Sequence, residues 1–85
     1  MGWYVYILEC SDKTLYTGAT NDVIKRVKKH INGTGAKYTR GRGPITLMWS
    51  YGVSSKTDAL KLEYRIKKLT KSRKLDLING ELTLF

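Results

Sequence analysis

The sequence predicts a mixed α/β (α+β) fold in which helices surround a small, mainly antiparallel sheet. Two stretches, residues 3–10 and 45–53, are rich in the aromatic and β-branched side chains typical of strands. Two other stretches repeat apolar residues at the helical spacing of three and four. The predicted order of elements is strand, strand, helix, strand, helix, helix.

The first two strands should form a hairpin that leads into the first helix. Residues 11–14 have turn chemistry, and residues 15–18 read as the returning strand. Thr20 or Asn21 can cap the helix, whose dipole favours the following Asp22. This helix should end near residues 32–33, and the side chains expected to face the core are Val23, Ile24, Val27 and Ile31.

The second half of the chain should hold the third strand and two more helices. Residues 33–44 form a loop rich in glycine, before the strand at 45–53. Residues 55–58 read Ser-Lys-Thr-Asp, a capping-box pattern that opens the second helix. A shorter helix covers about 71–78 and stops at Gly80. The apolar stripe of the second helix consists of Ala59, Leu62, Ile66 and Leu69.

Composition limits the classes of function. A chain of 85 residues can bury one hydrophobic core, so we expect a single domain over residues 1–85. Sixteen Lys and Arg against seven Asp and Glu give a net charge of +9. Such a surplus favours a polyanionic partner, with nucleic acid ahead of an anionic membrane. The alternative is a basic surface with no specific partner.

Composition also limits the kind of metal that the protein could bind and the cell compartment in which we expect it. Cys10 is the only cysteine and His30 the only histidine, so an intrachain disulfide is excluded and a zinc site would lack its usual ligands. A bound metal would then be a hard cation held by oxygen, such as Mg²⁺ or Mn²⁺. The apolar stretch 3–8 is too short for a membrane span and lacks a signal-peptide pattern, which predicts a cytoplasmic protein.

Three tyrosines are the first candidate site residues. Tyr4 and Tyr6 share one face of the first strand, and Tyr16 can approach Tyr6 if the hairpin register allows it. A phenol titrates near pH 10, so a catalytic tyrosine would need cations or a metal nearby to accept a proton. The alternative is that all three are half-buried sheet aromatics.

Arg26 and His30 lie four residues apart on one helical row that also includes Asp22. Arg26 could present its guanidinium to two phosphate oxygens, or it could pair with Asp22. His30 could share in proton transfer, or it could be structural. The row borders the apolar stripe of the helix, so both side chains are candidates for a site at its edge.

Glu63 is the most informative acidic residue because it lies at the edge of the second helix's apolar stripe. A carboxylate there loses solvation unless a charge or hydrogen bonds compensate. A bound Mg²⁺ would do so, and so would an ion pair with Lys67 at i+4. One protein carboxylate is enough for a Mg²⁺ that keeps several waters and takes oxygens from a phosphate.

The loop between the first helix and the third strand has the composition of a nucleic-acid contact. Its cations and its aromatic ring lie among glycines that permit close approach to a phosphate backbone. The alternative is a basic loop without specific contacts. The candidate nucleic-acid-binding residues are Lys37, Tyr38, Arg40 and Arg42.

Together these residues resemble the GIY-YIG endonuclease family over residues 3–69. The stretches 35–44 and 59–63 are most similar to its small stand-alone bacterial branch, typified by YhbQ and YazA. That branch is similar to the nuclease subunit of the SLX structure-specific endonuclease. The family's elements correspond to Tyr4-Val5-Tyr6, Tyr16-Thr17-Gly18, the arginine Arg26, the histidine His30 and the acidic metal ligand Glu63.

The resemblance implies a three-stranded antiparallel sheet flanked by helices, and a Mg²⁺- or Mn²⁺-dependent hydrolysis of DNA phosphodiesters, structure-specific and serving repair or recombination. By analogy, Tyr6 or Tyr16 assists deprotonation of the attacking water, Arg26 stabilises the phosphate charge and Glu63 holds the metal. Two positions depart from the usual pattern: Tyr4 replaces a common glycine, and Ala19 replaces a lysine of excision-repair relatives. The zinc domain of the SLX-type subunit has no counterpart, so the loop or a protein partner would choose the substrate. The alternative function is a nucleic-acid-binding module on the same fold with little or no turnover.

Overall fold

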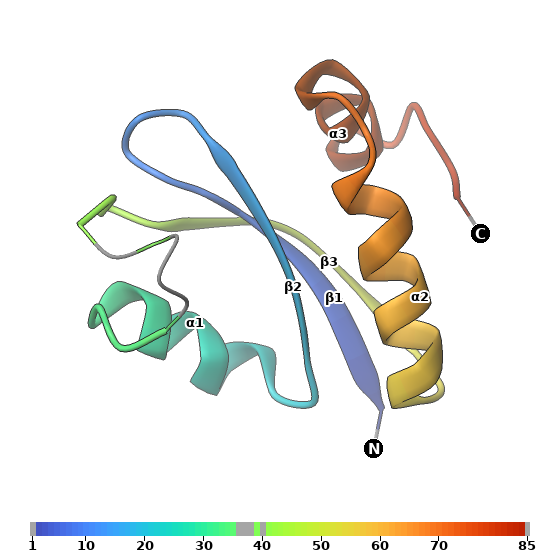
Figure 1. Cartoon of the computed structure of the whole chain (residues 1–85), viewed down its shortest axis with the longest axis horizontal. Helices are drawn as coiled ribbons and strands as arrows, with labels where there is room; N and C mark the ends of the chain where they lie inside the picture. The colour runs from blue at the N-terminus through green and yellow to red at the C-terminus, as the bar shows by residue number, and fades with distance from the viewer. Residues whose placement is uncertain (1, 36–38, 40, 85) are drawn as a thin grey trace.

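The protein folds into a three-stranded antiparallel sheet with three helices, as a computed structural model that describes residues 2–35, 39 and 41–84 shows (Figure 1). The predicted fold class and element order are confirmed. The elements are β1 (Trp3–Glu9), β2 (Leu15–Thr20), α1 (Val23–Ile31), β3 (Thr46–Val53), α2 (Lys56–Lys67) and α3 (Lys71–Ile78). Within the described residues, none of the helices has the length and apolar character needed to cross a membrane.

The sheet has β1 at its centre, with β2 and β3 antiparallel on either side. In the β1–β2 register, Tyr6 lies opposite Gly18 and Leu8 lies opposite Tyr16. Residues opposite one another, and residues two apart on one strand, share a face of the sheet. Tyr6, Gly18 and Tyr16 therefore lie on the same face.

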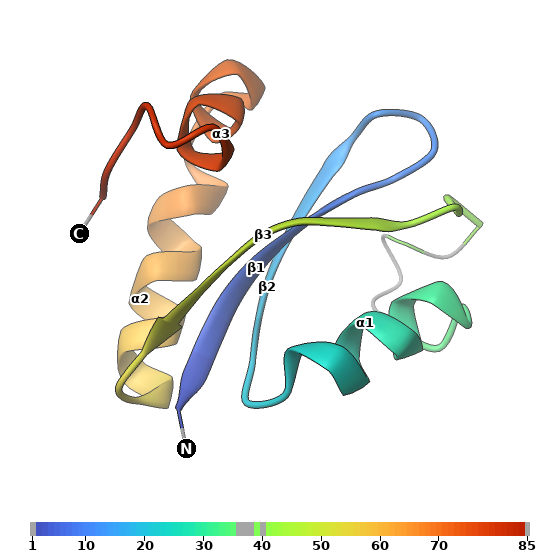
Figure 2. The same cartoon turned by 180° about the vertical axis from the view of Figure 1, so that it is seen from behind.

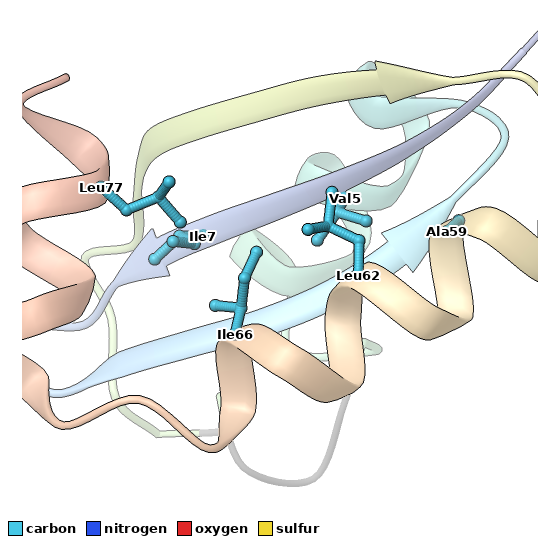
Figure 3. Close-up of a cluster of buried hydrophobic side chains, with 6 residues drawn as sticks. All are labelled: Val5, Ile7, Ala59, Leu62, Ile66 and Leu77. Atoms are coloured by element: carbon cyan, nitrogen blue, oxygen red, sulfur yellow. The ribbon is translucent and has the colours of Figure 1, made fainter. Parts of the chain in front are cut away.

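The apolar core occupies the other face of the sheet (Figure 3). Val5 and Ile7 of β1 pack there against α2 and α3, and both are completely buried. The helices contribute Ala59, Leu62, Ile66 and Leu77. Figures 1 and 2 show α1 on one side of the sheet and α2 with α3 on the other. The face of the sheet that carries Tyr6 and Tyr16 therefore lies toward α1 and the loop that follows it.

The start of each of the first two helices is capped by the side chain of the residue before it. Ser55 accepts a hydrogen bond from the backbone N–H of Asp58 at 3.1 Å, which confirms the predicted cap of α2. The predicted cap of α1 was wrong: Asp22 is the cap, and its Oδ1 accepts from the N–H of Lys25. Thr20 is still part of β2, and its hydroxyl accepts from the N–H of Asp22, so it braces the cap.

The orientation of α1 also differs from the prediction. Ile24 and Ile31 were expected to face the core, but 71% and 59% of their surfaces are exposed. His30 is turned inward instead and is 1% exposed. The imidazole is stable there because both of its ring nitrogens have hydrogen-bond partners, so its burial leaves no polar atom unpaired. The spacing of apolar residues along the helix gives no information about these two hydrogen bonds, so it could not predict that His30 faces inward.

Candidate active site

Tyr6 and His30 form a buried polar pair on the face of the sheet that carries α1. The Tyr6 hydroxyl lies 3.0 Å from Nε2 of His30, and each residue is 1% exposed. Nδ1 of His30 lies 2.8 Å from Oγ1 of Thr39, which fixes the other side of the ring. Thr39 was not predicted as a site residue, because a threonine in a glycine-rich loop has no pattern that marks it.

Two glycines allow the Tyr6 and His30 rings to approach the backbone closely. A Cβ atom at Gly18 would lie 2.5 Å from Cζ of Tyr6 and closer still to its hydroxyl oxygen. A Cβ atom at Gly35 would lie 2.6 Å from Nδ1 of His30. The residue after Tyr16-Thr17 must therefore be a glycine, because the ring of Tyr6 occupies the space that any side chain at Gly18 would need.

Tyr16 brings a third ring to this cluster. Its ring centroid lies 6.4 Å from that of Tyr6 and 5.2 Å from that of His30, and the rings are tilted relative to one another. Such tilted contacts are favourable between aromatic rings at these separations. The hairpin register thus brings Tyr6 and Tyr16 together, as their spacing allowed, and His30 joins them from α1.

The two titratable groups of the central pair are both uncharged at neutral pH. Burial raises the pKa of Tyr6 above its usual value of 10.0, although a hydrogen bond from Arg26 acts in the opposite direction. Burial lowers the pKa of His30 below 6.5, and the positive charge of Arg26 lowers it further. A neutral imidazole beside a phenol can accept the phenolic proton, which a charged imidazolium cannot do.

Arg26 connects this pair to a cation-rich cavity. The cavity has a volume of about 200 Å³, and its basic lining residues are Lys25, Arg26 and Lys29. The carboxylate of Asp22, the alternative partner for Arg26, accepts from the N–H of Lys25 as the helix cap. Asp22 also lines the cavity, but the three cations outnumber its one carboxylate, so the cavity can bind an anion of the size of a phosphate group.

Glu63 lies on α2, and its side chain is 16% exposed. Its Oε2 lies 2.8 Å from Nζ of Lys67, so the ion pair predicted as one alternative is present. The negative charge of Glu63 makes a small contribution to the raised pKa of Tyr6, in the same direction as burial. Leu60, Glu63, Tyr64 and Lys67 line a hollow of about 210 Å³.

The donor set around Glu63 suits a hard cation better than zinc. Within the described part of the chain, no group of three or more His, Cys, Asp and Glu side chains could hold a metal ion. Mg²⁺ is commonly held by one or two carboxylates together with waters and substrate phosphates. A single carboxylate is compatible with that kind of site, with waters and the substrate phosphate supplying the remaining oxygens.

Of the candidate nucleic-acid contacts in the basic loop, the structure describes Arg42. Lys37, Tyr38 and Arg40 lie outside the described residues. Arg42 forms an ion pair with Asp12, with Nη1 and Oδ2 separated by 2.6 Å, and its carbonyl oxygen accepts from the N–H of Ser11 at 2.8 Å. Arg42 thus joins the loop to the hairpin turn, in addition to any contact with nucleic acid.

Comparison with known proteins identifies the family. Residues 2–76 match the family model of the GIY-YIG catalytic domain. The UPF0213 protein of Clostridium perfringens is 55% identical over 78 residues, which cover 92% of this chain and 84% of that protein. The UPF0213 protein of Halobacterium salinarum is 54% identical over 71 residues, covering 84% of this chain and 92% of that protein.

Two solved structures have the same fold. The solution NMR structure of the UPF0213 protein of Bacillus halodurans has a TM-score of 0.62 and 49% identity, covering 95% of this chain and 86% of that one. The solution NMR structure of a protein from E. faecalis has a TM-score of 0.63 and 33% identity, covering 100% and 92%. Because the family model spans most of the chain and these relatives match nearly all of it, the protein belongs to the GIY-YIG family of nuclease domains.

Proposed function

We propose that this protein, acting as one domain over residues 1–85, is a divalent-metal-dependent endonuclease that hydrolyses phosphodiester bonds in DNA. The observation that carries the proposal is the Tyr6–His30 hydrogen bond of 3.0 Å, with Arg26 beside it and the charge of Glu63 acting on it. A proton acceptor, a phosphate-binding cation and a carboxylate are the groups that hydrolysis of a phosphodiester requires.

His30 is the final proton acceptor in this proposal. The imidazole of His30 carries its proton on Nδ1 and donates a hydrogen bond from there to Thr39. Nε2 is therefore left to accept a hydrogen bond from the Tyr6 hydroxyl. The attacking water gives its proton to the Tyr6 oxygen as Tyr6 passes its own proton to Nε2. The new P–O bond forms from the water oxygen, and the bond from phosphorus to the leaving oxygen breaks.

Tyr16, Arg26 and Glu63 position and stabilise the reacting groups. Tyr16 is more exposed than Tyr6, so we assign it to orient the attacking water. Arg26 binds the phosphate in the cation-rich cavity and stabilises the charge that develops there. Glu63 would hold the metal, which supplies further positive charge at the phosphate when bound. If Glu63 held the metal in place of its ion pair with Lys67, the Lys67 ammonium would be left to contact the DNA backbone.

The test is a cleavage assay on linear, flapped and branched DNA, with Mg²⁺, Mn²⁺ or EDTA. The Glu63→Gln variant should lose cleavage by about 100-fold or more, in line with the loss of an essential electrostatic group. Glu9→Gln is the matched control, because Glu9 also forms an i,i+4 ion pair with a lysine, Lys13, and lies outside the site. Preference for flapped or branched DNA over linear duplex would support a role in repair or recombination.

Cleavage that persists in EDTA, or that is equal in Glu63→Gln and wild type, would overturn the assignment of Glu63. The carboxylates of Glu63 and Glu9 are 16% and 26% exposed and their lysine partners are at least half exposed, so loss of either ion pair should change stability by about 0–1 kcal/mol and both variants should remain folded. The same assay on RNA tests the choice of DNA. Addition of a cell extract tests whether a protein partner alters the choice of substrate.

The second candidate function is nucleic-acid binding with little or no turnover. The Glu63–Lys67 ion pair favours it, because a carboxylate neutralised by lysine needs no metal. This function predicts DNA binding that weakens steeply with salt and is unaffected by Glu63→Gln. Binding should weaken when Lys37, Arg40 and Arg42 are changed together. Cleavage by wild-type protein that depends on Glu63 would exclude it.

A further inference from the structure

We propose that Tyr64 forms a stacking subsite for one nucleobase of the substrate, next to the carboxylate of Glu63; the proposal rests on the proposed nuclease function. Tyr64 is 62% exposed, and Leu60 one turn before it is exposed as well. It follows Glu63 in α2, and both residues line the hollow of about 210 Å³. No role in the proton transfer or in phosphate binding accounts for this exposed ring.

The surroundings of Tyr64 combine a flat apolar surface with cations. Leu60, one turn before Tyr64 on α2, is 47% exposed and lines the same hollow. Nζ of Lys68, one turn after Tyr64, lies 4.4 Å from the centroid of its ring. Lys67 contributes a second ammonium at the hollow. The row Leu60–Tyr64–Lys68 therefore offers a ring for stacking and a cation for the adjoining phosphate.

A nucleobase is the occupant that this chemistry favours. Bases stack on aromatic side chains irrespective of sequence, because every base has a π-face. The positive charge of Lys68 complements the phosphate of the same nucleotide, whereas the ammonium of Lys67 is paired with Glu63. Glu63 lines this hollow and is also a member of the candidate site, so a strand bound at the site would pass close to Tyr64. A base must leave its pair before its face can reach Tyr64.

The test measures binding, in EDTA, of a short single-stranded DNA and of an oligomer of the same length made only of abasic residues. Tyr64→Ala should weaken binding of the normal oligonucleotide about tenfold and leave that of the abasic oligomer unchanged. Tyr64→Phe keeps the ring and should bind as wild type does. Lys68→Gln should weaken binding of both oligomers, because it removes a phosphate contact. Fluorescence of a 2-aminopurine base should be quenched by wild type and by Tyr64→Phe, but not by Tyr64→Ala.

The subsite is overturned if Tyr64→Ala affects both oligomers equally or neither of them. Equal affinity of the wild-type protein for the two oligomers would also overturn it, because the bases would then contribute nothing to binding. The result of this binding test is independent of the result of the cleavage assay for the proposed function. Base-dependent binding without any cleavage would contradict the nuclease alone, whereas normal cleavage of single-stranded DNA by Tyr64→Ala would contradict the subsite alone.

Discussion

The hydroxyl of Tyr6 lies 3.0 Å from Nε2 of His30, across 24 residues of sequence. This contact joins the central strand to α1 on the face of the sheet opposite the apolar core. Thr39 holds the second ring nitrogen at 2.8 Å, so the imidazole is fixed from both sides. The polar cluster is thus a structural junction as well as the candidate proton acceptor, and substitutions there test both roles.

Gly18→Ala should damage the site far more than Gly52→Ala. Both glycines lie opposite a tyrosine of β1, but a Cβ at Gly18 would collide with the Tyr6 ring, whereas one at Gly52 would lie 3.3 Å from the nearest atom of Tyr4. We expect Gly18→Ala to lower the free energy of unfolding by about 1–3 kcal/mol, as overpacking does, and to reduce cleavage. Urea unfolding of both variants measures the difference. Equal losses would contradict the steric role of Gly18.

Substitution of Arg26 should change the titration of His30. The guanidinium charge disfavours a protonated imidazole, so Arg26→Gln should raise the pKa of His30 relative to the wild-type protein. Arg26→Lys retains the charge and should leave the pKa lower than in Arg26→Gln. His30 is the single histidine, so its ring proton gives one NMR signal to follow against pH. A pKa unchanged in Arg26→Gln would show that burial alone lowers it.

The lowered pKa of His30 should make the protein less stable below pH 6.5. In the unfolded chain the imidazole titrates near 6.5, while in the folded protein its pKa is lower. Between these two values the unfolded state binds more protons, so the free energy of unfolding falls as the pH falls. Urea unfolding at several pH values should show this decline, and His30→Gln should remove that part of it. Cleavage should fall as the pH drops through the pKa of His30 in the folded protein, because a protonated His30 accepts no proton.

Thr17→Val should stabilise the protein. Thr17 is 3% exposed, and its hydroxyl has no hydrogen-bond partner among the described residues. Valine has nearly the same shape and removes an unpaired buried polar group, so we expect a gain of about 1 kcal/mol in the free energy of unfolding. Thr20→Val is the control, because the Thr20 hydroxyl accepts from the N–H of Asp22 and its loss should destabilise. Thermal unfolding compares the two, and a destabilised Thr17→Val would contradict the prediction.

The apolar half of the fold was predictable from local pattern. In α2, Ala59, Leu62 and Ile66 are buried as their spacing predicted, because only burial removes that stripe from water. The capping box at Ser55 was predictable for a similar reason, since it depends on residues three apart. In α1 the same method was wrong for Ile24 and Ile31, because two hydrogen bonds to His30 settle which face turns inward.

The order of the elements, the positive charge and the set of candidate groups could be predicted from the amino-acid sequence; these groups are Tyr6, Tyr16, Arg26, His30 and Glu63. How these groups meet depends on the packing of the helices against the sheet. The strand register sets Tyr6 over Gly18, the turn of α1 brings His30 to the Tyr6 hydroxyl, and Thr39 arrives from the loop. Each of these contacts joins residues remote in sequence, and its geometry depends on how the helix and the sheet pack together. Local propensity and periodicity carry no information about that packing, whereas they suffice for the elements themselves.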